Sequence, residues 1–431
     1  MNYPKYLFYR LIGVDIVKVF SLNAMATLVR MLTGMISVKV VAVIIGPSGI
    51  ALLGQLSNFN AILLNMANGG INSGITKYVA EYKEDNSSIK KYISNALHIT
   101  AICSFIVSLI MIFGCVYLSR LILLNDEYYY VFIVFGFTIF LYTLNGLFVS
   151  ILNGYKHFKK YVKVNICGTI LGLLYSIALV TTLGLSGALI NAVTYQSIVF
   201  FITLYMCRKE HWFNLDYFRE KFDVNIIRKY LGFSAMTLTA MALFPIYQLF
   251  LRGYVISQIS ATDAGIWEGM NRISSMYLGV ITTAFGVYYL PRLSEIKDTV
   301  GLHNELFHCY KYMVPLLLLI GCVVFSLRHF ILWLLFTPDF YPMENLFIWQ
   351  LCGDFFKITS WMLAYIMVAK AKAKVFIVTE IVFSSTYFLI SYLLVRINGI
   401  VGLTQGYFIN YIIYMIAMCV YFRNILIPNK L

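Results

Sequence analysis

Charged residues are scarce in this chain, and their scarcity excludes an ordinary soluble globular protein. Only 12% of the 431 residues are Asp, Glu, Lys or Arg, whereas 60% are hydrophobic. Soluble domains carry about twice that charged fraction. Apolar segments recur from one end of the chain to the other, each near the roughly 20 residues that a helix needs to cross a bilayer. The sequence therefore predicts an all-α integral membrane protein with many spans.

Sequence motifs of nucleotide, metal and disulfide chemistry are also missing. No G-x-x-x-x-G-K-[ST] loop is present, so we expect no ATP hydrolysis by this chain, and the six histidines form no H-E-x-x-H motif. The eight cysteines fall within the predicted spans or at their ends, where small apolar packing residues are expected rather than disulfides. The polar N-terminus has no A-x-A-like site, so we expect no cleaved signal peptide. We expect this chain to need no cofactor and not to be an enzyme.

Hydropathy predicts twelve membrane-spanning helices. Because twelve is even, both termini should lie on the same side. The longest polar connection, residues 208–229, divides the chain into an N-lobe of six spans (1–207) and a C-lobe of six spans (230–431). The predicted spans are residues 20–45, 50–76, 93–119, 128–153, 163–184, 187–207, 230–256, 264–290, 308–327, 345–369, 375–395 and 401–422.

The basic residues in the connections predict the orientation. Of the 33 Lys and Arg residues, only Arg120, Arg328 and Arg396 fall in connections on one side, and most others fall on the opposite side. The positive-inside rule makes that second side cytoplasmic, together with both termini. A net charge of +14 that follows the loops in this way argues for a membrane and against a nucleic-acid partner.

Several polar residues lie deep within the predicted spans of the first half. The first span carries Arg30 and Lys39, and at about 100° per residue Asn58, Asn65 and Asn72 of the second span fall on one helical face. A charge at the bilayer centre costs roughly 2.5–3.5 kcal/mol even on lenient scales. These side chains should therefore line a wet or protein-lined interior. Spans three to six, nine and twelve carry no deep charge and are interpreted as scaffold.

The second half has similar polar faces. Gln248 and Arg252 share a face of the seventh span, and on the eighth span Glu268 precedes Arg272 by one turn, so that the two can pair. Two later spans add a second polar face and a further acid, and these residues are Asp354, Lys357, Trp361, Tyr365 and Glu380.

Each of these residues also has a purely structural interpretation. Glu268–Arg272 could be an ion pair that pins two helices, as could Asp354 with the lysine three residues later, while Lys39 could snorkel to the outer surface. The asparagines could bond between helices. Arg30 and Arg252 have no acid in their own spans, which leaves the acid of the eleventh span or backbone carbonyls as partners. Intramembrane cations nevertheless outnumber acids, and arginine suits a phosphate fork, so we favour an anionic ligand.

Five segments carry a family resemblance. They are residues 46–49 (GPSG), 74–82 (GITKYVAEY), 264–269 (AGIWEG), 289–294 (YLPRLS) and 349–357 (WQLCGDFFK). Together they resemble the polysaccharide-export flippases of the MOP superfamily, in particular the O-antigen and enterobacterial-common-antigen translocases.

The resemblance implies a two-lobe transporter with a central cationic cavity lined mainly by spans one, two, seven and eight. Its cargo would be an undecaprenyl-diphosphate-linked oligosaccharide, the O-antigen repeat unit, moved from the cytoplasmic to the periplasmic leaflet of the bacterial inner membrane by alternating access. Diphosphate contacts would come from Arg30, Arg252 and Arg272, assisted by Lys357 and Lys39. Contacts to sugars would come from Asn58, Asn65, Asn72, Gln248, Trp361 and Tyr365, and Glu268, Asp354 and Glu380 would serve in ion pairs or coupling.

Two other functions remain open. A multidrug or metabolite antiporter of the same superfamily would share the fold, but a cation exporter should bury an excess of carboxylates. A membrane polymerase or ligase acting on lipid-linked sugars would need a large outer loop. Besides the lipid-linked sugar, we expect membrane lipids and components of the polysaccharide polymerase as partners, and the chain itself as a monomer.

Overall fold

The computed structural model describes the backbone of residues 3–370 and 372–427. Within these ranges it describes all side chains except those of residues 3–24, 233, 235–241, 287 and 373. The described chain is helical, and eight of its helices are long and apolar enough to cross a membrane. The predicted all-α membrane fold is therefore confirmed. The eight segments are Met25–Ala67, Asn86–Phe113, Asp126–Gly154, Phe158–Cys207, Thr299–Ser326, Pro338–Ala369, Lys374–Asn398 and Val401–Tyr421.

Glycines with left-handed backbone angles interrupt the longest helices. Helix α1 (Tyr3–Ala67) is broken at Gly46 (φ 66°, ψ −172°), and α6 (Phe158–Cys207) is broken at Gly184 (φ 58°, ψ −131°). Only glycine adopts such angles without strain. Both breaks fall where the sequence predicts a turn between two spans. Helices α7 and α8 are long but are not among the eight apolar segments, so the count of twelve spans stays a prediction.

The second predicted span is not one continuous helix. Helix α1 ends at Ala67, and α2 (Asn72–Tyr82) begins five residues later. Between them Gly69 and Gly70 both have a φ of 65°. The prediction of an uninterrupted helix over 50–76 is therefore wrong, and the three asparagines of this span do not share one helical face.

Internal contacts divide the chain into two units, and the division differs from the predicted lobe boundary. Unit 1 contains Met1–Val40 and Phe59–Met241, and unit 2 contains Val41–Asn58 and Ala242–Leu431. In this division the connection 208–229 belongs to unit 1, residues 41–58 of α1 belong to unit 2, and the rest of α1 belongs to unit 1. The two lobes of six spans each remain a prediction.

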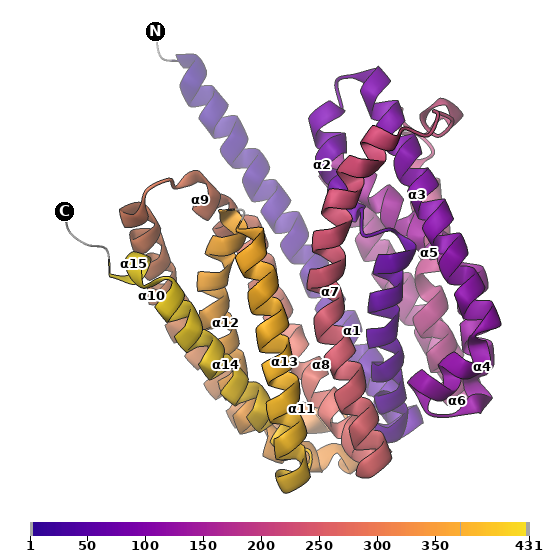
Figure 1. The fold of residues 1–431 in the computed structure, drawn as a ribbon, viewed down its shortest axis with the longest axis vertical. Helices are drawn as coiled ribbons and strands as arrows, with labels where there is room; N and C mark the ends of the chain where they lie inside the picture. Colours follow the sequence, from indigo (N-terminus) through magenta and orange to yellow (C-terminus); the bar gives the residue numbers. More distant parts are fainter. Residues whose placement is uncertain (1–2, 371, 428–431) are drawn as a thin grey trace. The chain divides into compact units, whose positions relative to one another are not determined.

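Unit 1 is built around α5 (Tyr129–Gly154), which packs against α3 (Asn86–Phe113) and α6 (Figure 1). Asp85 caps α3 by accepting the amide protons of Ser87 and Ser88, and the hydroxyl of Ser88 helps to lower the pKa of this carboxyl. Trp212 and Tyr217 of the connection are buried in the apolar core of the unit. The short elements are α4 (Cys115–Leu118), η1 (Ser119–Leu123), η2 (Asp126–Tyr128) and η3 (Leu215–Tyr217).

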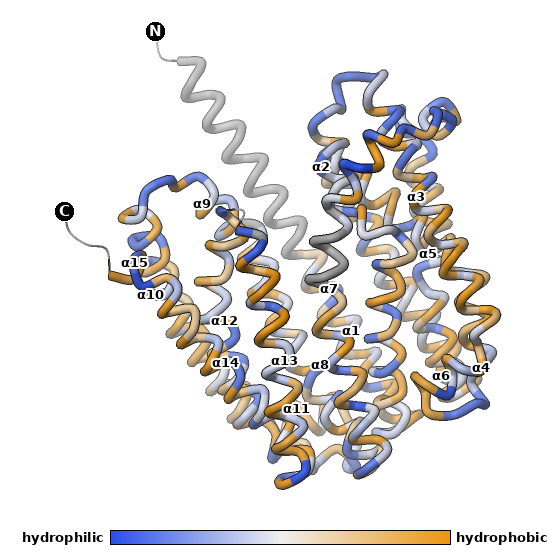
Figure 2. The backbone as a smooth tube through the Cα atoms, viewed as in Figure 1, coloured by the Kyte–Doolittle hydropathy of each residue, from blue (hydrophilic) through white to orange (hydrophobic). Residues whose placement is uncertain are grey.

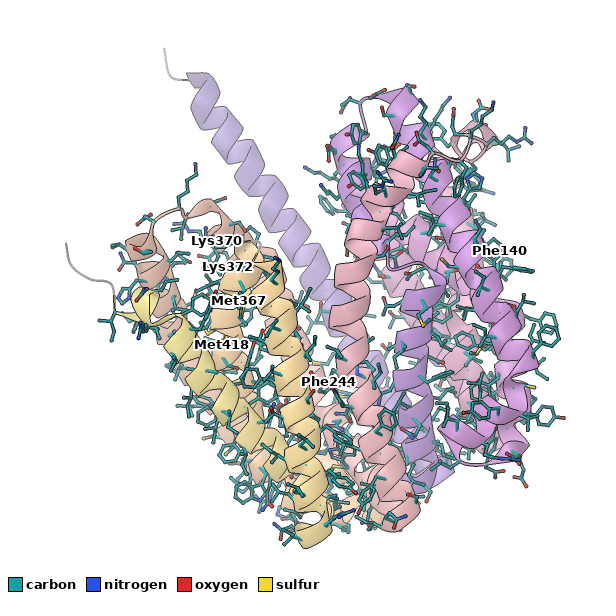
Figure 3. All side chains as sticks on the ribbon, in the orientation of Figure 1. Phe140, Phe244, Met367, Lys370, Lys372 and Met418 are labelled. Atoms are coloured by element: carbon teal, nitrogen blue, oxygen red, sulfur yellow. The ribbon has the colours of Figure 1, made fainter. Side chains whose placement is uncertain are left out.

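In unit 2, α14 (Val401–Tyr421) packs against both α12 (Phe347–Ala369) and α13 (Ala373–Asn398), and Figure 1 shows the three side by side. Met367 and Met418, labelled in Figure 3, belong to its apolar core. The long helices are mostly apolar and the connections polar (Figure 2). The remaining elements are α7 (Val224–Gln258), α8 (Ala261–Ala284), η4 (Phe285–Tyr289), α9 (Leu290–Glu295), α10 (Thr299–Ser326), α11 (Arg328–Leu335), η5 (Pro338–Leu346) and α15 (Arg423–Leu426).

Within unit 2, α8 makes a very close crossing with the turn in α1. A Cβ atom on Gly265 would lie 1.8 Å from the carbonyl oxygen of Pro47, so only glycine fits there. The Oγ of Ser48 lies 3.3 Å from the Oγ1 of Thr262 beside this crossing. The break in α1 therefore contacts the first turns of α8 and holds the start of α8 against α1.

We expect Gly265→Ala to destabilise the protein, because its methyl group would collide with backbone that has no room to move. The free energy of unfolding should fall by about 1–3 kcal/mol, as in other overpacked sites. The melting temperature of the purified protein in detergent measures this. Gly321→Ala in α10 is the control, since its Cβ would meet no atom within 4 Å. Equal melting temperatures of the two variants would contradict the close crossing.

Candidate functional site

A cavity of about 390 Å³ lies within unit 2, a volume typical of small-molecule sites. Helices α7, α8 and α12 supply most of its lining, with one residue from α1 and one from α14. It brings together half of the predicted site residues, although they are distant in the sequence. These are Asn58, Gln248, Arg252, Glu268, Arg272, Lys357 and Trp361.

Two arginines share a single carboxylate in this cavity. Nη2 of Arg252 lies 2.5 Å from Oε2 of Glu268, and Nε of Arg272 lies 3.2 Å from Oε1 of the same group. The i,i+4 pair Glu268–Arg272 was predicted. Arg252 was expected to have no acid in its own span, and its carboxylate partner lies on the next helix, α8. Gly54 of α1 makes room for the shared carboxylate, because a Cβ there would lie 2.7 Å from its carboxyl carbon. The cluster carries one net positive charge.

Arg252 is buried with much of its hydrogen-bonding capacity unused. Its side chain is only 2% exposed, and its Nε and Nη1 have no hydrogen-bond partner among the described residues. The guanidinium group lies 5.3 Å from the ring of Trp267, within cation–π distance. Nδ2 of Asn271, also in the cavity lining, is a further buried donor without a partner among the described residues. Because unpaired buried donors cost about 1–3 kcal/mol each, an anion with several oxygens would stabilise this arrangement.

Asp354 does not form the predicted ion pair with Lys357. Its buried carboxylate accepts hydrogen bonds from the hydroxyls of Ser274 (2.6 Å), Tyr407 (2.7 Å) and Tyr277. The amide of Gln350 adds a fourth bond, of 3.3 Å. Both residues are described, and no ion pair within 4.0 Å joins them. The carboxylate is satisfied by uncharged donors, so it leaves the lysine free to act on a ligand.

The ammonium group of Lys357 lies among four aromatic rings. Its Nζ is 4.9 Å from the centre of Trp361, 5.5 Å from those of Tyr407 and Tyr411, and 5.6 Å from that of Phe244, which is labelled in Figure 3. Cation–π attraction holds the charge there without neutralising it. The cavity lining therefore contains three cations and one carboxylate, a surplus of positive charge.

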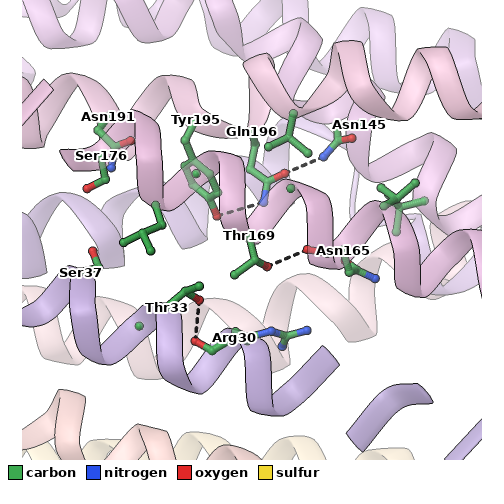
Figure 4. Close-up of a pocket in the computed structure, with 17 residues that line it drawn as sticks. Arg30, Thr33, Ser37, Asn145, Asn165, Thr169, Ser176, Asn191, Tyr195 and Gln196 are labelled. Carbon is green, nitrogen blue, oxygen red and sulfur yellow. Dashed lines mark hydrogen bonds between the residues drawn. The ribbon is translucent and has the colours of Figure 1, made fainter. Parts of the chain in front are cut away.

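A second and larger cavity, of about 590 Å³, lies within unit 1 between α1, α5 and α6. Figure 4 shows Arg30, Thr33 and Ser37 of α1 facing polar residues of α6. Spans four to six, which were interpreted as scaffold, therefore also contribute polar lining to a cavity. The signal was present as uncharged amides and hydroxyls in spans that carry no deep charge. The polar residues of α5 and α6 in the lining are Asn145, Asn165, Thr169, Ser176, Asn191, Tyr195 and Gln196.

The other predicted site residues line neither of these two cavities. Asn65 donates to the carbonyl of Ala61 in its own helix (2.7 Å), and Tyr365 packs its ring against the aromatic core of unit 2. Both contacts are structural, but the bond of Asn65 is not the bond between helices that the structural interpretation expected. Lys39, Asn72 and Glu380 are half-buried on α1, α2 and α13.

Comparisons with known proteins agree on one family and one fold. Residues 16–297 match the model of the family described as polysaccharide biosynthesis protein. The chain is 26% identical to the proteins named Lipid III flippase of Escherichia coli (strain K12) and of Shigella flexneri, over 92% of this chain and 95% of each relative.

Solved structures of transporters share the fold. An inward-facing multidrug resistance MATE family transporter of the MOP superfamily matches with a TM-score of 0.72 and 14% identity, over 95% of this chain and 97% of that one. The Lipid II flippase MurJ in its inward closed conformation matches with a TM-score of 0.69 and 16% identity, over 94% and 89%. The chain therefore belongs to the polysaccharide biosynthesis protein family, and it has the helical fold of these membrane transporters.

Proposed function

We propose that this protein is a flippase for an undecaprenyl-diphosphate-linked oligosaccharide, an O-antigen repeat unit, which it moves from the cytoplasmic to the periplasmic leaflet of the bacterial inner membrane. The observation that carries the proposal is the surplus of positive charge in the unit 2 cavity, where three cations face one carboxylate. The likeness to the Lipid III flippases and to the fold of the Lipid II flippase supports the same class of cargo.

The diphosphate binds to the two arginines that share Glu268. Arg272 uses only its Nε for that carboxylate, and its side chain is 23% exposed, so both of its terminal amino groups are available to phosphate oxygens. Arg252 supplies its Nε and Nη1 groups as further donors to the diphosphate. Lys357 adds a point charge from α12. The shared carboxylate holds both guanidinium groups in position and neutralises only one of them.

The remaining lining of the unit 2 cavity fits the first sugar. Asn58 and Gln248 offer amide groups, and Trp361 offers an aromatic face for stacking. The polyprenyl tail stays in the lipid. If both termini are cytoplasmic, the first span ends at the periplasmic side. Lys39 lies near that outer end and acts on the anion during exit.

The membrane potential is sufficient to drive the movement. Moving about two negative charges outward across an inside-negative potential of 100 mV is favourable by about 4–5 kcal/mol. The same field returns the empty cationic cavity inward. A drug antiporter shares the fold, but a cavity with surplus positive charge repels cationic drugs.

Deletion of the gene followed by lipid extraction tests the function. We expect an intact diphosphate-linked oligosaccharide to accumulate on the cytoplasmic face of the inner membrane, where reagents confined to the periplasm do not reach it. Accumulation of unpolymerised units on the periplasmic face would instead indicate a polymerase or ligase. Unchanged lipids with increased drug sensitivity would indicate an antiporter.

We expect Arg252→Ala and Arg272→Ala each to slow flipping by about 10- to 100-fold, because a hydrogen bond to a charged group contributes about 1.5–3 kcal/mol. Flipping of fluorescent undecaprenyl-diphosphate oligosaccharide in proteoliposomes measures this. Arg120→Ala is the matched control, since its ion pair with Asp126 is exposed and contributes little. Normal rates in both cavity variants would refute the proposed diphosphate site.

Substitutions of Lys357 and Asp354 should affect different quantities, the flipping rate and the melting temperature. Lys357→Met should slow flipping at least about tenfold with little change in melting temperature, because no carboxylate among the described residues forms an ion pair with it within 4.0 Å. Asp354→Ala should lower the melting temperature, because it leaves four buried donors without their acceptor, at about 1–3 kcal/mol each before relaxation. Both readouts come from the same purified proteins. If Lys357→Met unfolds while Asp354→Ala is stable, the two roles are wrongly assigned.

A further inference from the structure

The unit 1 cavity has a lining of a different chemical character from that of unit 2. It contains many amide and hydroxyl side chains, one cation and no carboxylate. Arg30 supplies the cation, and no carboxylate among the described residues pairs with it. Polar lining of this kind is costly in contact with hydrocarbon, so an acyl chain is a poor ligand. The lining is suited to a hydroxyl-rich ligand with at most a small negative charge.

A hydrogen-bond network holds the amides of this cavity in fixed orientations. Nδ2 of Asn145 donates to Oε1 of Gln196 (2.6 Å), whose Nε2 donates to the hydroxyl of Tyr195 (3.0 Å), as Figure 4 shows. Thr203 donates to Oδ1 of Asn145 (2.6 Å) and so orients the first amide. Pre-oriented polar groups bind a ligand at lower entropic cost.

One acceptor in the lining is buried and unused. Oδ1 of Asn191 is buried without a hydrogen-bond partner among the described residues. A buried amide oxygen without a partner costs about 1–3 kcal/mol, which a ligand hydroxyl would recover.

Glycines keep the cavity open. A Cβ on Gly34 of α1 would meet no atom within 4 Å, and Gly172 of α6 leaves room beside the ring of Tyr195. The resulting volume of about 590 Å³ lies well within the range of ligand sites and exceeds that of the unit 2 cavity.

We propose that the unit 1 cavity binds the sugar chain of the transported lipid, and that Arg30 binds an anionic group attached to that chain. The amides and hydroxyls bond the sugar hydroxyl and N-acyl groups. The anionic group is either a carboxylate or a phosphate substituent on a sugar of the chain. This inference rests on the proposed flippase function and adds that the protein reads the glycan separately from the diphosphate.

The test compares two lipids in proteoliposomes that contain the full chain. One is undecaprenyl diphosphate carrying an N-acetylhexosamine trisaccharide, and the other carries a single N-acetylhexosamine. Gly34→Phe fills the cavity from a position with free space, so we expect it to slow flipping of the trisaccharide lipid at least about tenfold relative to the monosaccharide lipid. Gly321→Phe, placed in similarly open space on α10, is the control and should change neither rate.

A second variant guards against misfolding of the first. The double variant Gln196→Leu/Asn191→Leu replaces two amide side chains by apolar side chains of similar size. The melting temperature reports whether each variant folds. If the folded cavity variants slow the flipping of both lipids equally, or slow the flipping of neither, the inference is overturned while the flippase function stands. Failure of the wild-type protein to flip either lipid would overturn the proposed function itself.

Binding of soluble probes identifies the partner of Arg30. Saturation-transfer NMR with triacetylchitotriose, N-acetylglucosamine 1-phosphate and glucuronic acid should show sugar contacts in the wild type that Gly34→Phe loses. Arg30→Gln should lose the preference for the phosphorylated probe if the anion is a phosphate, or for the uronate if it is a sugar carboxylate. An unchanged preference for both probes would exclude an anion site at Arg30.

Discussion

The sharing of Glu268 between Arg252 and Arg272 is the interaction on which the chemistry of unit 2 depends. A single carboxylate lowers the free-energy cost of holding two guanidinium groups in a low-dielectric interior. A protein that buries a charge without any partner is less stable by several kcal/mol than one in which that charge is paired. One carboxylate cannot neutralise both. The result is a site that is folded and positively charged before any ligand arrives, as a preorganised anion site requires.

Asp354 and Lys357 show the complementary solution. The acid could have cancelled the nearby lysine, but three hydroxyls and an amide satisfy it instead. The lysine is stabilised by aromatic rings, which attract a cation and leave its charge intact. In both clusters the fold stabilises cations and leaves a net positive charge. This is the property that separates a site for anionic cargo from a set of ion pairs that only pin helices.

Sequence patterns predicted the membrane fold, the turns and the cationic cluster more successfully than the continuity of individual helices. Hydropathy averages over about 20 residues, so it cannot detect the break at Gly69 and Gly70, which changes only a few backbone angles. The amide-lined cavity of unit 1 was overlooked for a related reason. Asparagine and glutamine are common in spans that bond to neighbouring helices, and periodicity does not tell a bonded amide from one that faces a cavity.

The sequence by itself determined that this is a helical membrane protein with basic residues buried in its spans, because length, hydropathy and charge are local properties of the chain. The pair Glu268–Arg272 is local as well, since both residues lie one turn apart on α8. The tertiary structure alone decided that Arg252 joins that pair, that Asp354 bonds to hydroxyls and not to Lys357, and that α1, α5 and α6 enclose a polar cavity. Each of these depends on which faces of different helices meet.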